Sequence, residues 1–334
     1  MKKTIHIILA IAALVSCVKT GGVYPSETEI RFEPMTVLPT KANHFGAVAD
    51  AEYPVKENFD VYGYWSDDWD SDKVINYLIS PEEDSGVEFE HKVNYWVGKK
   101  PYYWPKYGSL KFACYSPSSL NIEHDYATDT FKKIGYEQPA LTSKTWDLLL
   151  APTTGAHTAL SAGDHVTIAF EHALSWITLQ VKAKAEHVAN AFEIKKITIH
   201  DVYTKADLNA KMSDGVQVEE WSNRSNPVDY VIFEGSQLVT MEATPIETTT
   251  AGMVIIPQAT TRVTIDYTQR EIENSTAELT GQKVQLDLIL SSNYKNWEPG
   301  KHYVYNLTFN LEEIKIKPTV KPWTPVENTL NKKD

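Results

Sequence analysis

Short runs in which apolar and polar residues alternate recur along most of this chain, and they limit its fold more than any other feature. In one of them Val166, Ile168 and Phe170 fall on the same side of an extended strand. Alternation with a period of two, leaving one polar face, is typical of half-buried antiparallel strands. We therefore predict an all-β fold. The other alternating runs are 59–65, 110–115, 177–182, 263–267, 284–290 and 303–311.

Turn residues separate these runs at the spacing of β-sandwiches, and the one helix candidate, 186–192, is short enough to be a crossover turn. A chain of 334 residues fits two domains at roughly 100–200 residues each. We place the boundary in the small, polar stretch 156–164. The expected divisions are a leader at 1–16, a tether at 17–27, an N-terminal β-sandwich at 28–160, and a C-terminal β-sandwich at 161–334 with a terminal strand at 313–323.

The N-terminus has the pattern of a secretory signal that ends in a lipidated cysteine. Two lysines precede an apolar run at positions 5–15, and Leu14 and Ser16 come just before Cys17. Cleavage before Cys17 would leave acyl chains such as palmitate on its sulfur and amine, and more than one chain makes the anchor stable. An ordinary signal peptide with a chance cysteine is the alternative. A membrane-spanning helix would need roughly 20 apolar residues.

The charge and the cysteines narrow the class of protein further. A formal net charge of −12 argues against a nucleic-acid partner, whose phosphates need a basic face. If Cys17 carries lipid, Cys114 has no partner for a disulfide, and its place in an alternating apolar run predicts a buried, inert thiol.

Recognisable catalytic signatures are missing from the sequence: it has no Gly-rich phosphate loop, no HExxH zinc motif and no paired CxxC. Asp68, Asp70 and Asp72 have the spacing of a calcium loop, but Lys73 and Ile79 stand where such a loop needs Gly and Glu. An acidic surface loop is the better interpretation. We expect no enzyme, no cofactor, no metal and no catalytic residue.

Two terminal segments have a cleanly divided strand pattern. In the segment 28–34, Ile30 and Phe32 point one way and charged residues point the other. We predict that it is the first strand, that it lies in an edge groove of the N-terminal domain, and that it can be removed.

In the segment 313–323, Ile314, Ile316 and Val320 share one face, whereas Lys315, Lys317 and Lys321 share the other; it also holds two prolines. Proline lacks the N–H that a central strand needs, so this strand belongs at an edge. It is either the last edge strand of its own domain or a strand that pairs with another subunit.

Taken in order, the motifs of the chain resemble the fimbrillins of the Mfa-like type, the pilus subunits of Bacteroides-type anaerobes. The matching motifs, after the lipidation signal, are 29–32, 59–64, 102–105, 110–112, 115–117, 146–151, 166–170, 172–175, 254–258, 297–303 and the closing strand to Trp323.

The resemblance implies two transthyretin-like β-sandwich domains and export as an outer-membrane lipoprotein. In this family a trypsin-like protease cuts after the first strand, usually after Arg, and a C-terminal strand of the next subunit fills the groove left behind. The matching position here is Lys41, while Arg31 lies inside the expected strand. An uncut subunit would keep its groove closed, as an anchor or accessory subunit does.

The resulting hypothesis is a lipid-anchored fimbrial subunit or adhesin of the cell surface that assembles by strand exchange. Its expected partners are other fimbrial subunits, outer-membrane lipid through Cys17, and host or bacterial surface ligands. The residues fit a shaft, tip or anchor subunit alike. The alternative is a surface glycan-binding lipoprotein of a polysaccharide-uptake system, which would expose a coplanar aromatic pair. The candidates for that pair are Trp65, Trp69, Trp96 and Trp104.

Overall fold

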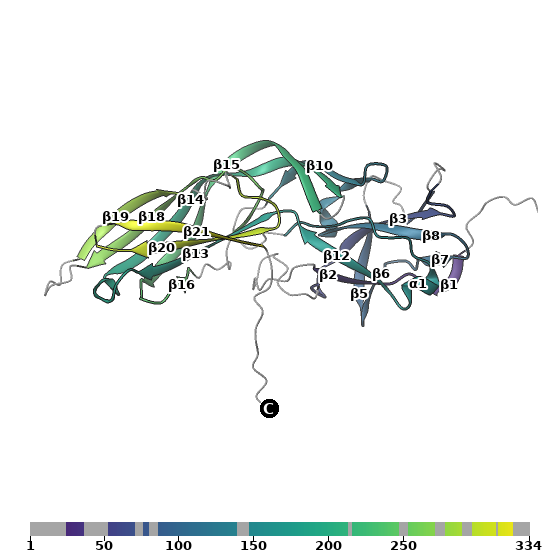
Figure 1. Cartoon of the computed structure of the whole chain (residues 1–334), viewed down its shortest axis with the longest axis horizontal. Coiled ribbons are helices and arrows are strands. Elements are labelled where there is room, and N and C mark those ends of the chain that lie inside the picture. Colours follow the sequence, from purple (N-terminus) through teal and green to yellow (C-terminus); the bar gives the residue numbers. More distant parts are fainter. Residues whose placement is uncertain are drawn as a thin grey trace, which may run out of the picture.

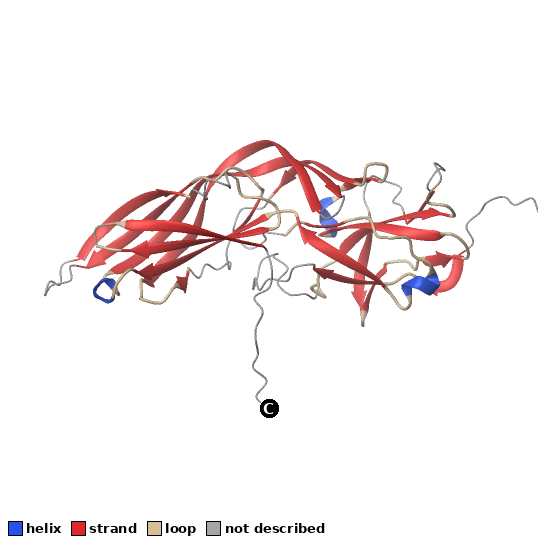
Figure 2. Ribbon diagram, viewed as in Figure 1, coloured by secondary structure: helices blue, strands red, loops and turns tan. Residues whose placement is uncertain are grey.

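The computed structural model is an elongated molecule built almost entirely of β-strands, as predicted (Figures 1 and 2). Its helices are α1 (Ala159–Ala162) and two short 3₁₀ turns, η1 (Ser118–Leu120) and η2 (Glu186–Val188). Among the described residues no helix is long and apolar enough to cross a membrane. The structure describes residues 25–36, 53–70, 76–79, 86–138, 147–212, 216–246, 253–270, 278–288, 296–311 and 313–322.

Seven strands of the N-terminal half close on themselves, and we call this ring the N-terminal barrel. Its order around the ring is β3 (Phe59–Ser66), β5 (Val87–Lys92), β6 (Tyr95–Gly98), β2 (Phe32–Thr36), β12 (Val166–His172), β11 (Leu149–Ala151) and β8 (Ser109–Ser116), which returns to β3. Outside the ring, β4 (Asn76–Ile79) extends β3, and β1 (Pro25–Glu29) pairs with β7 (Tyr103–Pro105).

The C-terminal half is two facing sheets. One consists of β13 (Ser175–Ala183), β20 (Lys301–Phe309) and β21 (Ile314–Pro322), with β16 (Thr244–Pro245) and β17 (Met253–Ile255) on the other edge of β13. The other, which we call the bridging sheet, consists of β15 (Val216–Leu238), β14 (Phe192–Met212), β18 (Arg262–Arg270), β19 (Glu278–Asp287), β10 (Thr130–Glu137) and β9 (Glu123–Asp125).

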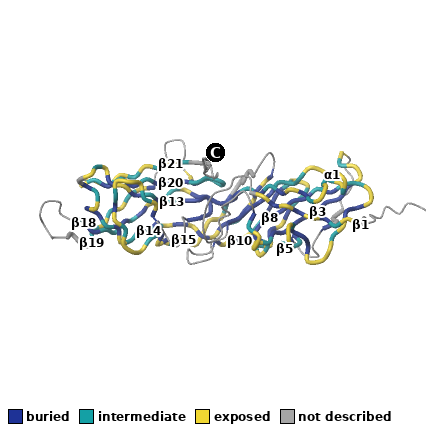
Figure 3. The backbone as a smooth tube through the Cα atoms, turned by 90° about the horizontal axis from the view of Figure 1, so that it is seen from below, coloured by how far each residue is buried: buried dark blue, intermediate teal, exposed yellow. Residues whose placement is uncertain are grey.

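Three apolar cores follow from this arrangement. One lies inside the barrel, one lies between the two C-terminal sheets, and a third, which we call the middle core, lies between the other two cores. The middle core forms because β10 and the end of β14 cover the outer face of β3 and β8. Every residue of β3 is therefore buried (Figure 3). Phe59 and Val61 enter the barrel, whereas Tyr62 and Tyr64 enter the middle core. The expectation of half-buried strands is wrong for β3.

Three further details differ from the sequence-based expectations. The pairs β2–β12 and β13–β20 are parallel, since long connections separate their strands. The strand β12, expected in the C-terminal domain, pairs with β2 and β11 and thus belongs to the barrel. β2 is flanked by β6 and β12 and is not an edge strand. The division into two tandem transthyretin-like domains stays a prediction.

Candidate functional site

The first candidate strand-exchange element is β2 together with the residue pair before it. Ile30 and Phe32 are fully buried in the barrel core. The ring of Phe32 makes edge-to-face contacts with Phe89 and Phe112, with centroids 4.9 and 5.0 Å apart. Such pairs add about 0.5–1.5 kcal/mol beyond the burial of apolar area. Removing this segment would therefore open the centre of the core.

β2 is held mainly from one side. It pairs with β12 over five residues, but its described pairing with β6 is the single pair Phe32 opposite Trp96. The carbonyl of Arg31 accepts from Val166 N at 2.8 Å, so Arg31 directs its backbone towards β12. Backbone N–H and C=O groups of alternate residues point to the same edge of a strand, so those of Arg31 point to β12 and those of Phe32 and Pro34 point to β6. Pro34 has no N–H to donate there.

A groove of about 550 Å³ lies beside β2 on this weakly paired side. Three apolar side chains at its rim reach solvent: Met35 is 38% exposed, Val55 58% and Val93 89%. The buried rings of Tyr53 and Trp96 form part of its wall. Glu33, His91, Asn94 and Thr167 also line the groove, so the open side of β2 is a surface of mixed apolar and polar side chains.

The second candidate element, β21, lies at the edge of its sheet among the described strands, as predicted. It pairs with β20 along its whole length, from Ile314 opposite Phe309 to Pro322 opposite Lys301. Ile314, Ile316 and Val320 are half buried and pack against the C-terminal core, whereas Lys315 and Lys317 are exposed. The segment therefore serves as an edge strand of its own chain in this structure.

The processing and lipidation candidates, Lys41 and Cys17, lie outside the described residues, as does residue 323. Arg31 is described: it lies between β1 and β2 rather than inside a strand, and its side chain is exposed. Its guanidinium contacts Glu29 at 3.5 Å and the ring of Tyr95 at 5.6 Å from the centroid.

The four tryptophans that could form a glycan platform do not form an exposed coplanar pair. Trp65, Trp96 and Trp104 are buried in the barrel core. Trp69 is half buried, donates to Ser109 Oγ at 2.6 Å, and has the amine of Lys111 4.5 Å from its ring centroid. By the criterion set above, these positions favour core packing over carbohydrate binding.

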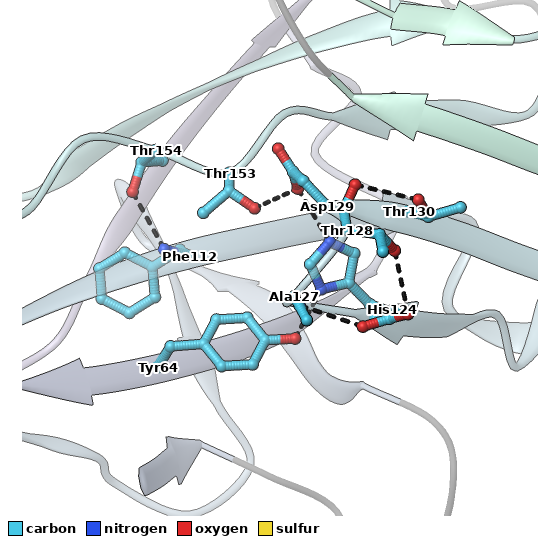
Figure 4. A network of polar contacts seen from close by, with 10 residues as sticks. Tyr64, Phe112, His124, Ala127, Thr128, Asp129, Thr130, Thr153 and Thr154 are labelled. Atoms are coloured by element: carbon cyan, nitrogen blue, oxygen red, sulfur yellow. Dashed lines mark hydrogen bonds and ion pairs between the residues drawn. The ribbon is translucent and has the colours of Figure 1, made fainter. Parts of the chain in front are cut away.

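A network of polar side chains fastens the β9–β10 hairpin onto the barrel (Figure 4). Tyr64 Oη lies 2.5 Å from His124 Nδ1, and His124 Nε2 lies 3.0 Å from Asp129 Oδ1. Thr153 donates to the same carboxylate at 2.5 Å. The imidazole is buried, so the network joins β3, β9 and the segment after β11 inside the protein.

A buried carboxyl, that of Asp60, lies beside Tyr115 of the middle core. Asp60 accepts from Tyr115 Oη at 2.5 Å, and its other oxygen has no hydrogen-bond partner. Burial, partly offset by the Tyr115 hydrogen bond, raises the pKa of Asp60 to about 7. Burial also raises the pKa of the Cys114 thiol, which is free and buried as predicted.

Two pairings of buried polar groups are not apparent from the sequence. His172 Nδ1 lies 2.6 Å from Asp147 Oδ2, with both side chains buried. The side chain of Gln258 bonds to the backbone of Tyr203, 55 residues away. The alternation pattern marks such positions as polar but cannot pair them. Among the described residues no cluster of His, Cys, Asp or Glu could hold a metal ion.

Comparison with known proteins agrees with this architecture. The family model described as fimbrillin-like matches residues 46–323. A fimbrial protein from Bacteroides vulgatus superposes with a TM-score of 0.57 at 15% identity, covering 89% of this chain and 99% of that chain. A candidate cell adhesion protein from Bacteroides uniformis superposes with a TM-score of 0.51 at 13% identity, with the same coverage. A search of curated proteins finds no match.

Proposed function

Because the chain belongs to the fimbrillin-like family, we propose that it is a lipid-anchored fimbrial subunit or adhesin of the bacterial cell surface. We propose a structural role without enzymatic activity, with other fimbrial subunits as its partners. The family match over 46–323 is the observation that carries this proposal. The anchor would be Cys17 in the outer membrane, as the lipidation signal before it predicts.

The proposed mechanism is exchange of a strand between subunits. Two features of β2 support it: Ile30 and Phe32 occupy the barrel core, and the strand is weakly held on the β6 side. Cleavage near Lys41 would release the segment and expose the β12 edge beside an apolar cavity. A strand with alternating apolar side chains would bind there through main-chain hydrogen bonds and side-chain pockets.

The donor we propose is the β21 segment of a neighbouring subunit. Ile314, Ile316 and Val320 lie on one face of it and could enter successive pockets. Since these side chains are half buried on their own core, β21 would have to leave β20 before it is donated. The exposed Lys315 and Lys317 would stay in water in both states.

Limited digestion of the purified precursor with trypsin, followed by mass spectrometry and size-exclusion chromatography, tests this mechanism. We expect cleavage at Lys41, loss of the N-terminal segment, and oligomers that form with increasing concentration. The variant Lys41→Gln is the matched control and should stay monomeric. A stable monomer after complete cleavage at Lys41 would count against strand exchange.

A further inference from the structure

The long strand β14 changes neighbours halfway along its length. Its first part, Phe192–Ile199, pairs with β18 in the C-terminal half, and its later part, from Lys205, pairs with β10 over the barrel. Residues 200–204 lie between these two ladders and are the place where the bridging sheet passes from one half of the molecule to the other. A gap in a ladder leaves backbone groups that need other partners.

The side chain of Gln258 fills this gap as a backbone residue would. Its Oε1 accepts from Tyr203 N at 2.9 Å, and its Nε2 donates to Tyr203 O at 3.2 Å and to Ile256 O at 3.0 Å. The main-chain oxygen of Gln258 accepts from Trp297 N at 2.8 Å. Because the side chain is buried, water does not compete for these bonds.

The segment that carries Gln258 also separates two cores. Met253 and Ile255 belong to the C-terminal core, whereas Val254 and Ile256 belong to the middle core. Alternate residues of a strand point to opposite faces, so this short segment is the wall between the two. Any bend of β14 at Tyr203 would have to move that wall.

The opposite edge of β14 is fastened at the same level by β15. Asn226 has a left-handed backbone with φ of 55°. Its Nδ2 donates to Thr204 Oγ1 at 2.8 Å, and that hydroxyl donates to Asn226 O at 2.9 Å. Arg224 Nε donates to Pro257 O at 2.9 Å, which ties β15 to the segment of Gln258.

A bulge just before this point is fastened as well. Asp201 has a φ of 54°, and the register of β14 with β15 shifts between Ile199 and Val202. Asp229 accepts from Asp201 N at 3.2 Å and lies 3.0 Å from His200 Nδ1. Bulges bend a strand and increase its twist. Here the bend is held in place by side chains on both edges.

We infer that residues 200–204 form a fixed elbow, and that Gln258 is the positioning residue that sets its angle. An unfastened bulge in a two-stranded ribbon would let the two halves swing. The amide of Gln258 instead continues the ladder from β18 to β10, so the halves move as one body. This is a property of the monomer, whatever it assembles with.

Distance measurement by double electron–electron resonance on the full chain tests the elbow. Nitroxide labels are placed by Lys132→Cys on β10 and Lys195→Cys on β14, in a Cys17→Ser background. Cys114 is buried and stays unlabelled. Both label sites are exposed and lie on opposite sides of the elbow. Lys132 pairs with Asn209 of β14, roughly 14 residues from Lys195, which corresponds to about 45 Å at the rise of a strand.

The parent should give one narrow distance distribution, and Gln258→Ala should broaden it or add a second maximum. Gln237→Ala is the matched control, because that amide bonds only to the adjacent carbonyl of Leu238 in its described contacts, and it should leave the distribution unchanged. A folded Gln258→Ala variant with the parent distribution overturns the inference.

Should Gln258→Ala fail to fold, Asn226→Gly decides the question. Glycine tolerates the left-handed backbone at this position but removes the side-chain bond to Thr204. A broadened distribution in this variant supports the elbow, and an unchanged one overturns it.

Discussion

Replacing Asp60 with asparagine should make the stability of this protein less dependent on pH. Burial raises the pKa of this carboxyl to about 7 from an ordinary value of 3.8. Between these two values the folded state holds a proton that the unfolded chain has released. The free energy of unfolding therefore falls as pH rises through this window and levels off above about pH 7.

The size of the effect follows from the shift. At about 1.4 kcal/mol per pKa unit, the raised pKa of Asp60 costs the folded state about 4 kcal/mol at pH 8 and under 2 kcal/mol at pH 5. The asparagine side chain of the variant cannot ionise, and its oxygen can still accept from Tyr115. A new unpaired N–H adds a cost of about 1–3 kcal/mol that does not depend on pH. The expected gain of Asp60→Asn over the parent is thus larger at pH 8 than at pH 5 by about 2–3 kcal/mol.

Urea unfolding curves at pH 5 and pH 8, followed by tryptophan fluorescence, measure this difference. Asp125→Asn is the matched control: the hydrogen bond from Thr128 lowers the pKa of Asp125 below its ordinary value of 3.8. This carboxyl is therefore ionised in both the folded and the unfolded parent at pH 5 and at pH 8, and its substitution should change the free energy of unfolding equally at the two pH values. If the difference between Asp60→Asn and the parent is the same at both pH values, the assignment of a buried carboxyl with a raised pKa is wrong.

Three further outcomes are expected. Cys17→Ser should release the protein from the outer membrane or block its processing, and a variant that still fractionates with that membrane like the parent would exclude the lipid anchor. Ile316→Asp combined with Val320→Asp should abolish oligomers of the trypsin-treated protein and lower the free energy of unfolding of the monomer by about 2–3 kcal/mol, since both side chains are half buried. Lys317→Ala should change neither quantity, and complete unfolding of the double variant would assign β21 to its own core. Phe32→Ala should cost about 3–5 kcal/mol in urea unfolding, as for other fully buried rings, and a loss under 1 kcal/mol would contradict the central place of β2 in the barrel.

Local alternation in the sequence predicted the strands well, because a strand with one face in solvent has polar residues on that face and apolar residues on the other. The alternating run at β12 and the divided pattern at β21 are examples. The same logic fails at β3, whose second face is covered by β10 and β14, more than 60 residues further on in the chain. Tyr62 and Tyr64 look like an exposed face until that cover is known.

Pairing between distant segments was the part that the sequence did not reveal. A parallel neighbour for β2 more than 100 residues away leaves no mark on the residues of β2 itself. The sequence pattern of β12 is that of any other half-buried strand, and it therefore gives no sign that β12 pairs with β2 and lies in the barrel. Gln258 was visible within a family motif, but its bond to Tyr203 depends on a gap in a ladder formed by three other strands.

The parallel pairing of β2 with β12 has a consequence for the order in which this chain folds. The carbonyl of Arg31 accepts from the amide of Val166, so the barrel cannot close until β12 has been synthesised. Closing the loop between Arg31 and Val166, about 135 residues long, costs about 4 kcal/mol of chain entropy, and topologies rich in such distant contacts fold slowly. β2, which is synthesised long before β12, is therefore among the last strands to be paired. Until then the unclosed barrel offers the edge of β12 and an apolar interior, and a strand from elsewhere competes with β2 for the same place.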